Sequence, residues 1–192
     1  MLRCCSFIVI FDLVTGAIRQ QLTWQRREVT WLQLSPDGRR LAAVSWPNRA
    51  RLWHLDTDHP VADWVASEGV VQRLAFSPDG GLLATAGDDN QITLWETAAG
   101  GRVAQLRGHK AEISALAFHP DGHTLASASL DHTLKLWHVP TWRELGTLRR
   151  DQMITFLAFA GEEPALFAGE YREALHLLRA PHSKDLSWPG FP

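Results

Sequence analysis

Three side chains in one stretch of the chain have the types that nucleophilic catalysis requires: His109, Ser127 and Asp131. In a hydrolase of this kind the Ser attacks, the His removes its proton and the Asp orients the His. The reaction also needs a pair of hydrogen-bond donors for the developing oxyanion, and nothing in the sequence indicates one. Whether the three residues do chemistry therefore depends on the elements that carry them.

Metal and phosphate sites have little support in the sequence. Four histidines cluster along the chain at His119, His123, His132 and His138. They alternate between turn ends and a strand, and no carboxylate or Cys completes a metal set of recognisable spacing. The corner Asp88-Asp89-Asn90 lacks the later Gly and Glu of a calcium loop. The glycine pairs at 80–81 and 100–101 do not open helices. We expect no metal and no cofactor.

Composition and charge exclude several classes of function. The 192 residues are 45% hydrophobic and carry a formal net charge of −2, so the chain can bury a core and has no charge excess typical of nucleic-acid or membrane binding. The only cysteines are the adjacent Cys4 and Cys5, so we expect no disulfide framework to stabilise the fold. The opening residues 1–11 have no small-residue cleavage site and are too short to span a membrane. We expect them to form a strand, in a cytoplasmic protein.

A repeat of 42 residues organises the chain. The turn at 35–38 recurs at 77–80 and, with His in place of Ser, at 119–122. Trp53, Trp95 and Trp137 keep the same interval, and one step back lies Phe11. A fixed period of this length is the signature of a repeat array.

Each repeat reads as four short strands. In the third unit, period-two alternation predicts strands at 112–118, 124–128, 133–138 and 143–148. Ser77-Pro78-Asp79-Gly80 has the composition of a type I turn between the first two strands, and residues 88–90 and 130–132 are the next hairpin corners. A sheet this narrow cannot bury both faces alone, so we expect the sheets to stack radially.

The third unit resembles the WD-repeat family of β-propellers. It has that family's Gly108-His109, a strand Ser at 127, a corner Asp at 131 and a strand Trp at 137, with the family's spacing. The resemblance covers roughly residues 7–179 and weakens outward from the second and third units. It implies an all-β fold of four-stranded antiparallel blades, about four of them plus a partial N-terminal one, in an incomplete or open propeller.

The resemblance also implies a structural role for the candidate catalytic residues. In the family they form a buried hydrogen-bond chain that ties the loop entering a blade to its second and third strands, and no reaction is performed there. The residues expected in such chains are His109, Ser127, Asp131 and Trp137 in the third unit, and Thr85, Asp89 and Trp95 in the second. Ser67 stands in the His position of the second unit. In the first unit Ala43 and Pro47 replace the hydroxyl and the Asp, and in the fourth Ala168, Arg172 and Leu178 replace all three.

A binding surface is expected at the end of the sheets that carries the fourth-to-first-strand loops and the second-to-third-strand corners. Aromatic and basic residues concentrate there at Trp24, Arg26, Arg27, Trp46, Arg49, Arg149, Arg150, Tyr171 and Arg172. Trp and Arg dominate protein interfaces, so we expect a non-catalytic scaffold that binds an acidic or phosphorylated protein partner. The alternatives are that the Arg residues only solvate loops while Trp24 and Trp46 pack together, that the patch binds nucleic acid, or that a site lies at the axis near Trp31, Arg73, Ala115 and Phe156.

Closure of the array is the remaining question. The expected parts are a partial blade at 1–22, blades at 23–180 and a flexible tail at 181–192. Residues 17–22 would close a ring of four if they supplied the last sheet's missing strand, whereas an open arc leaves two edges able to pair with other chains, including a second copy. We expect the chain to be the C-terminal piece of a longer protein; the alternatives are that it closes by pairing with another copy or that it is a decayed gene product. A further alternative for its function is a C-terminal sensor or regulatory segment of a multidomain signalling protein, kinase-linked or nucleotide-triphosphatase-linked.

Overall fold

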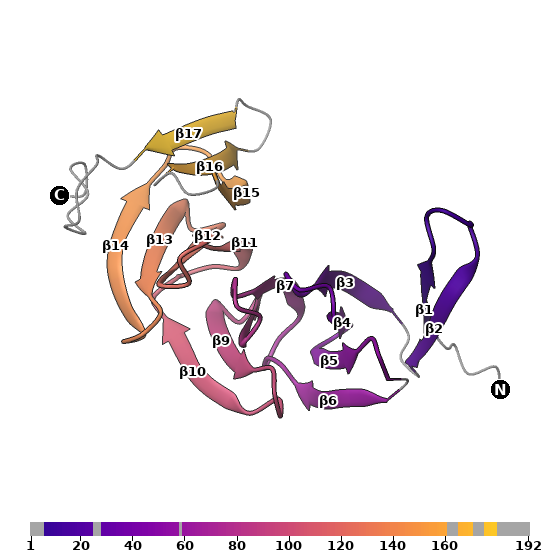
Figure 1. The fold of residues 1–192 in the computed structure, drawn as a ribbon. Coiled ribbons are helices and arrows are strands. Elements are labelled where there is room, and N and C mark those ends of the chain that lie inside the picture. The colour runs from indigo at the N-terminus through magenta and orange to yellow at the C-terminus, as the bar shows by residue number, and fades with distance from the viewer. Residues whose placement is uncertain (1–5, 25–27, 58, 161–164, 171–174, 180–192) are drawn as a thin grey trace.

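The chain folds into an arc of small antiparallel sheets (Figure 1). The computed structural model describes residues 6–24, 28–57, 59–160, 165–170 and 175–179. These residues form seventeen strands and no helix, so none of them forms a helix able to cross a membrane. The fold class expected from the sequence, all-β with four-stranded antiparallel blades, is confirmed.

The strands follow the 42-residue repeat. They group as a two-stranded sheet, three four-stranded sheets and a three-stranded sheet. The three four-stranded sheets, β3–β6, β7–β10 and β11–β14, are called the first, second and third sheets below, and β15–β17 the last sheet. In chain order these sheets contain β1 (Ser6–Phe11) and β2 (Ile18–Trp24); β3 (Val29–Leu34), β4 (Arg40–Ser45), β5 (Arg49–His54) and β6 (Pro60–Val65); β7 (Val71–Phe76), β8 (Leu82–Gly87), β9 (Gln91–Glu96) and β10 (Arg102–Arg107); β11 (Ile113–Phe118), β12 (Thr124–Ser129), β13 (Thr133–His138) and β14 (Arg143–Arg149); β15 (Ile154–Phe159), β16 (Ala165–Glu170) and β17 (Leu175–Arg179).

The turn between the first two strands of each complete sheet has the predicted chemistry. The Gly80 N–H donates to the Ser77 carbonyl at 2.8 Å, and the Ser77 hydroxyl donates to the Asp79 carboxylate. Gly80 has a φ of 69°, a left-handed conformation that costs glycine little. The turn therefore fixes the register of the hairpin that forms the inner half of each sheet.

The core lies between successive sheets. The second strands β4, β8 and β12 are buried on both faces, and small side chains there let the neighbouring sheets approach. Ala42 and Val44 of β4, for example, pack against Leu74 and Phe76 of β7 in the next sheet. Because each core is shared by two sheets, no sheet is a stable unit by itself.

The arc is open. In Figure 1 the first strands β3, β7, β11 and β15 lie on the inner side, and a gap separates the last sheet from the β1–β2 hairpin. Within the described residues β2 pairs only with β1, and β17 only with β16. The ring of four that residues 17–22 would close is therefore not formed.

The N-terminal hairpin differs in one respect from the sequence expectation. Strand β2 runs through Trp24, two residues beyond the expected boundary at 22. Residues 1–5, which include both cysteines, and residues 181–192, expected to be a flexible tail, lie outside the described residues.

Candidate functional site

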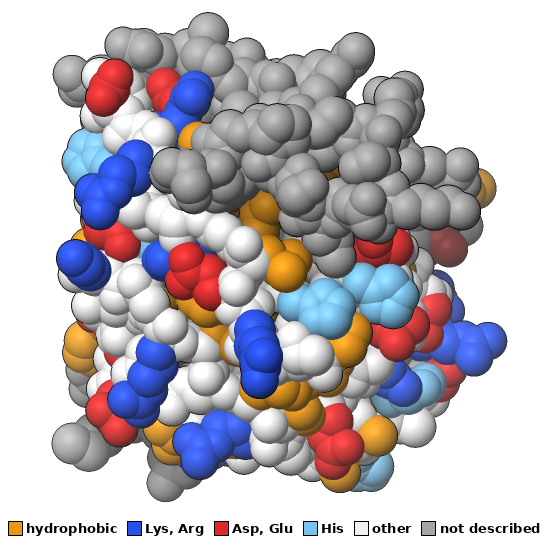
Figure 2. Space-filling view, turned by 90° about the vertical axis from the view of Figure 1, so that its left-hand side faces the viewer, with side chains coloured by type: hydrophobic (Ala, Val, Ile, Leu, Met, Phe, Trp, Pro, Cys, Tyr) orange, Lys and Arg blue, Asp and Glu red, His pale blue; other side chains and the backbone are white. Residues whose placement is uncertain are grey.

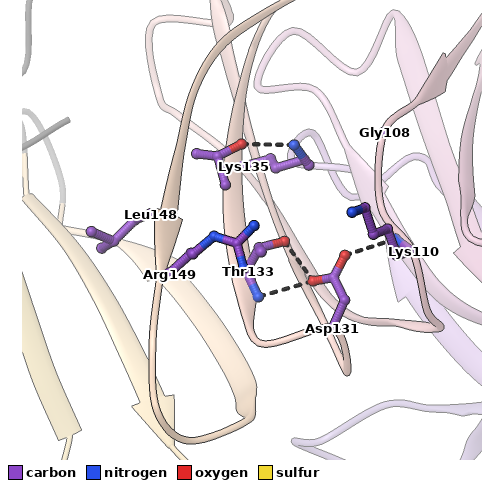
Figure 3. Close-up of a pocket in the computed structure, with 8 residues that line it drawn as sticks. Gly108, Lys110, Asp131, Thr133, Lys135, Leu148 and Arg149 are labelled. Carbon is purple, nitrogen blue, oxygen red and sulfur yellow. Dashed lines mark hydrogen bonds between the residues drawn. The ribbon is translucent and has the colours of Figure 1, made fainter. Parts of the chain in front are cut away.

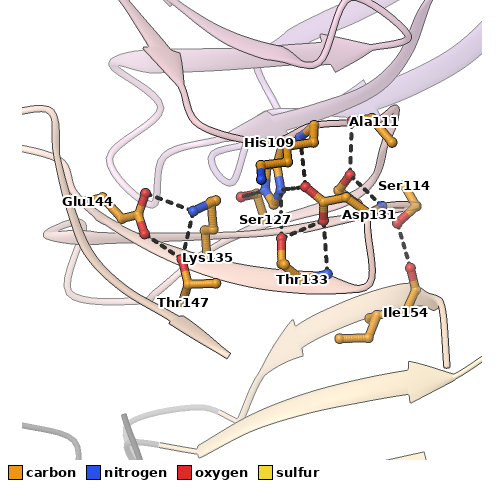
Figure 4. A network of polar contacts seen from close by, with 12 residues as sticks. His109, Ala111, Ser114, Ser127, Asp131, Thr133, Lys135, Glu144, Thr147 and Ile154 are labelled. Carbon is orange, nitrogen blue, oxygen red and sulfur yellow. Dashed lines mark hydrogen bonds and ion pairs between the residues drawn. The ribbon is translucent and has the colours of Figure 1, made fainter. Parts of the chain in front are cut away.

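The third sheet contains the complete polar chain that the sequence predicted (Figure 4). The Trp137 indole N–H donates to Ser127 Oγ at 2.8 Å, and Ser127 Oγ lies 2.7 Å from His109 Nε2. On the other side of the ring, His109 Nδ1 lies 3.2 Å from Asp131 Oδ2. We assign the proton to Nδ1, because the Asp131 carboxylate can only accept. The chain thus joins the loop before β11 to β12 and β13.

The position of this chain determines what it can do. Ser127 is fully buried and His109 is 8% exposed, so no substrate reaches the hydroxyl in this conformation. Burial lowers the pKa of His109 below its usual value. The pKa of Asp131 falls to about 2: burial acts to raise it, and the hydrogen bonds that its carboxylate accepts, led by Thr133, outweigh burial. The arrangement stabilises an ionised Asp beside a neutral His, as expected if the role of these residues is structural. We call this hydrogen-bond chain, from Trp137 through Ser127 and His109 to Asp131, the structural lock of the sheet.

The second sheet keeps a shortened form of the same lock. The Trp95 indole N–H donates to Thr85 Oγ1 at 2.9 Å. Ser67, in the position of the missing His, donates its hydroxyl directly to Asp89 at 2.6 Å. The Ser does not extend the chain to Thr85, which donates instead to the Ala66 carbonyl.

In the first sheet, a cluster of two Trp rings and two Arg side chains stands in place of the structural lock. Trp24 packs edge-on against Trp53 with ring centroids 5.6 Å apart, and the Arg51 guanidinium lies 5.3 Å from the Trp24 ring. Asp63 on β6 forms ion pairs with both Arg49 and Arg51 on β5. The ion pairs and the ring contacts therefore join the two outer strands to each other and to the N-terminal hairpin.

The structure separates the predicted contact residues into different environments. The prediction that Trp24 is an exposed loop residue is wrong: it ends strand β2 and is completely buried. Trp46 is 54% exposed and Arg149 is exposed at the end of β14. Arg49 is held by Asp63, and Arg150 by Glu170 at 2.9 Å. The remaining predicted residues, Arg26, Arg27, Tyr171 and Arg172, lie outside the described residues.

Arg149 lines a cleft of about 410 Å³ on the third sheet (Figure 3). The residues that line it are Gly108, Lys110, Asp131, Thr133, Lys135, Thr147, Leu148 and Arg149. Figure 3 shows Lys110 and Arg149 on either side of Asp131 and Thr133. Sequence reasoning missed Lys110 and Lys135. The available signal for Lys110 was its place directly after Gly108-His109, in a loop at the predicted binding end.

The charges in this cleft are unevenly compensated. Lys135 donates to Glu144 at 2.9 Å. Asp131 accepts from the backbone N–H of Lys110 at 2.7 Å as well as from β13. Neither the Lys110 ammonium nor the Arg149 guanidinium has an ion pair within the described part of the chain. Among the described residues, the cleft therefore presents two cations without an ion-pair partner around a carboxylate whose hydrogen bonds are satisfied.

The residues expected to line the axis lie on the inner strands. Trp31 is 43% exposed, and the Arg73 guanidinium lies 5.0 Å from its ring. Arg73 Nε donates to the Ser114 carbonyl of the next sheet at 2.5 Å. Phe156 is 53% exposed, whereas Ala115 is buried. These side chains are apolar or already engaged, and they do not form an acid and base pair.

Two further observations concern metal sites and the distribution of charge. Within the described residues, no group of three or more His, Cys, Asp or Glu side chains is arranged to hold a metal ion. On the face shown in Figure 2, basic and acidic side chains are interspersed, and neither sign forms a continuous field. That face does not provide the basic stripe typical of nucleic-acid recognition.

Comparison with known families agrees with this geometry. The family model described as "WD domain, G-beta repeat" matches three segments, residues 18–54, 59–96 and 100–138, which together make up more than half of the chain. A search of curated proteins found no match. Each matched segment ends at the third strand of a complete sheet, close to the Trp that anchors it.

Proposed function

Since the chain belongs to the WD40 repeat family, whose repeats generally mediate protein–protein interaction, we propose that it is a scaffold that binds an acidic or phosphorylated segment of a protein partner. The segment binds in the cleft between Lys110 and Arg149 on the third sheet. The strands serve as the rigid support, and the loops at this end supply the contacts.

The observation that carries the proposal is the pair of uncompensated cations. An exposed Lys and an exposed Arg flank a cleft whose other charged groups are internally paired. An incoming carboxylate or phosphate would accept charge-assisted hydrogen bonds from both Lys110 and Arg149. It would not break the hydrogen bonds that Asp131 already accepts. Trp46, more than half exposed at the same end of the first sheet, supplies an aromatic contact for a longer partner.

The test compares binding of a library of phosphorylated and unphosphorylated acidic peptides to the full chain and to a Lys110→Glu/Arg149→Glu variant. We expect the variant to bind the selected peptides at least tenfold more weakly, which corresponds to about 1.4 kcal/mol. Its melting temperature should stay unchanged, because both side chains are exposed.

A matched control is Arg102→Glu/Arg143→Glu, which makes the same change in charge. Both arginines are exposed at the opposite end of their strands β10 and β14. We expect this variant to bind as the unaltered chain does. Equal losses in both variants would show that only net charge matters, and failure of the unaltered chain to select any acidic peptide would contradict the proposal.

Nucleic acid is the alternative ligand for the same cations. Binding through phosphates along a nucleic acid weakens steeply with salt and regardless of sequence, whereas a single acidic peptide site depends on salt only modestly. A salt titration of binding to peptide and to oligonucleotide therefore separates the two ligands.

A further inference from the structure

Lys135 is a third cation of the cleft on the third sheet. It lies on β13, lines the cleft together with Lys110 and Arg149, and is only 8% exposed. Its ammonium donates to Glu144 at 2.9 Å and to Thr147 at 2.7 Å (Figure 4). An ammonium has three N–H donors. Counting the described residues, one N–H of Lys135 therefore remains for a further acceptor in the cleft.

Glu144 holds the Lys135 ammonium from the rim of the cleft. A Cβ added to Gly108, which lines the cleft, would lie 3.2 Å from Glu144 Oε2. The pKa of Glu144 is lowered: burial acts to raise it, and the hydrogen bonds that it accepts from Lys135 and Thr147 outweigh burial. The Glu144 side chain is 35% exposed, so water competes for its carboxylate and the ion pair contributes little net free energy. An incoming anion can therefore displace Glu144 from Lys135 at low cost.

Comparison along the repeat shows that the fold does not require these cations. One period earlier, in the second sheet, Glu68 and Thr93 stand at the positions of Lys110 and Lys135. In the first sheet Arg51 stands at the position of Lys135, but its Nε and Nη2 both donate to a carboxylate of β6, and two Trp rings lie beside it. The second sheet is thus built without cations at these two positions. Their presence in the third sheet therefore calls for another explanation.

We infer that the cleft selects a phosphorylated side chain, that Lys135 is the third donor to the phosphate, and that Glu144 occupies Lys135 until the phosphate displaces it. This inference rests on the proposed function of the cleft. A phosphate monoester has three terminal oxygens, one for each of Lys110, Lys135 and Arg149, whereas a carboxylate has two. Because Lys135 is shielded from water, it attracts a dianion more strongly than an exposed Lys does.

The experiment uses the acidic peptide that the full chain selects from the library, prepared with phosphoserine and with Glu at the position that determines binding. Isothermal titration calorimetry measures both dissociation constants. We expect the unaltered chain to bind the phosphoserine form about tenfold more tightly than the Glu form, the effect of one further hydrogen bond to a charged group. Lys135→Met, which keeps the length and the apolar stem of the side chain, should remove most of this preference.

A second variant, Glu144→Gln, changes binding in the opposite direction. It should bind the phosphoserine form about fivefold more tightly, because the competing charge on Lys135 is removed. The matched control is Glu96→Gln, which removes the same charge from an exposed position at the end of β9 in the second sheet and should leave the affinity unchanged. In the Lys135→Met background, Glu144→Gln should have little effect, because the two residues act as a pair.

Three results would overturn the inference. The first is equal affinity of the unaltered chain for the two peptide forms. The second is a Lys135→Met chain that keeps the preference for phosphoserine. The third is a gain from Glu144→Gln that is the same with and without Lys135, because that gain would reflect long-range charge alone. Each of these results leaves the proposed function standing if Lys110 and Arg149 are still needed for binding, whereas a chain that selects no acidic peptide contradicts the proposed function and this inference together.

Discussion

At the scale of single residues, hydroxyl groups that look reactive act as the central links of buried hydrogen-bond chains. Ser127 accepts the Trp137 indole N–H and contacts His109. Ser45, also fully buried, has no hydrogen-bond partner for its Oγ within the described residues. The two serines therefore have the same burial and opposite energetic roles.

This contrast makes a prediction. Ser127→Ala should destabilise the protein by about 1–3 kcal/mol, because it leaves two buried polar groups without their partner. Ser45→Ala should be neutral or slightly stabilising, since it removes an unsatisfied group. Urea unfolding of both variants measures the change in the free energy of unfolding. Equal changes would show that the hydrogen-bond chain through Ser127 does not contribute to stability.

The protonation of His109 makes the lock sensitive to acid. Its pKa is lowered by burial, so the folded state binds fewer protons than the unfolded state. Stability is therefore complete above the unfolded value of about 6.5 and declines as the pH falls below it. We expect the melting temperature to fall between pH 7 and 5, and to fall less in His109→Gln, which cannot gain the charge.

Asp131 contributes to the same trend in a lower range. Its pKa of about 2 lies below the usual 3.8, so its contribution to stability is present above about pH 4 and is lost as the pH falls toward 2.

The His109 prediction has a clear contrary outcome. If the melting temperature of His109→Gln still fell steeply between pH 7 and 5, the acid sensitivity in that range would belong to another group.

At the scale of elements, Trp24 joins the N-terminal hairpin to the first sheet. It ends β2 and contacts Trp53, and Arg51 lies over both rings. The Trp24 indole N–H has no hydrogen-bond partner in the described residues, so packing and these ring contacts hold the side chain in place.

Trp24→Ala should destabilise the protein by about 3–5 kcal/mol, because it leaves a large cavity. Amides of β1 and β2 should then exchange faster than those of the third sheet. Trp46→Ala, at a residue 54% exposed, should change stability by no more than about 0.5 kcal/mol. Thermal unfolding and hydrogen exchange measure both effects, and a mild Trp24→Ala would exclude the anchoring role.

Repetition explains which elements were predictable from the sequence. Strands expected at 124–128 and 133–138 are found at Thr124–Ser129 and Thr133–His138, because the alternation and the turn residues act locally. Trp24 was misplaced because its burial depends on Trp53, far along the chain, and no local signal distinguishes a strand end from a loop start. Lys110 and Lys135 were missed for a similar reason, since a cleft exists only after β13 and β14 are packed.

At the scale of the whole molecule, the arc has cores only where two sheets meet. Each inner strand contacts the next, and ties such as the Ser114 hydroxyl to the Ile154 carbonyl, at 2.5 Å, reinforce the junctions. Within the part of the chain that the structure describes, β1 and β17, the first and last strands of the arc, each pair with a neighbour on one edge alone.

We therefore expect a gradient of local stability. Backbone amides of β8, β9, β12 and β13 should exchange most slowly, and those of β1 and β17 most rapidly, because opening an end strand exposes fewer shared contacts. Hydrogen exchange in the absence of any partner tests this expectation. Equal protection from end to end would mean that the arc unfolds as one cooperative unit.

The shared cores also affect how such a gene can change in length. The turn that follows the first strand recurs at 35–38, 77–80 and 119–122, so a recombination event between two neighbouring turns would remove or duplicate one period and still join a first strand to a second. The new junction would bring together side chains of the same sizes as the old one, such as Ala42 and Ala84. Unequal crossing over thus has a low structural barrier in this protein.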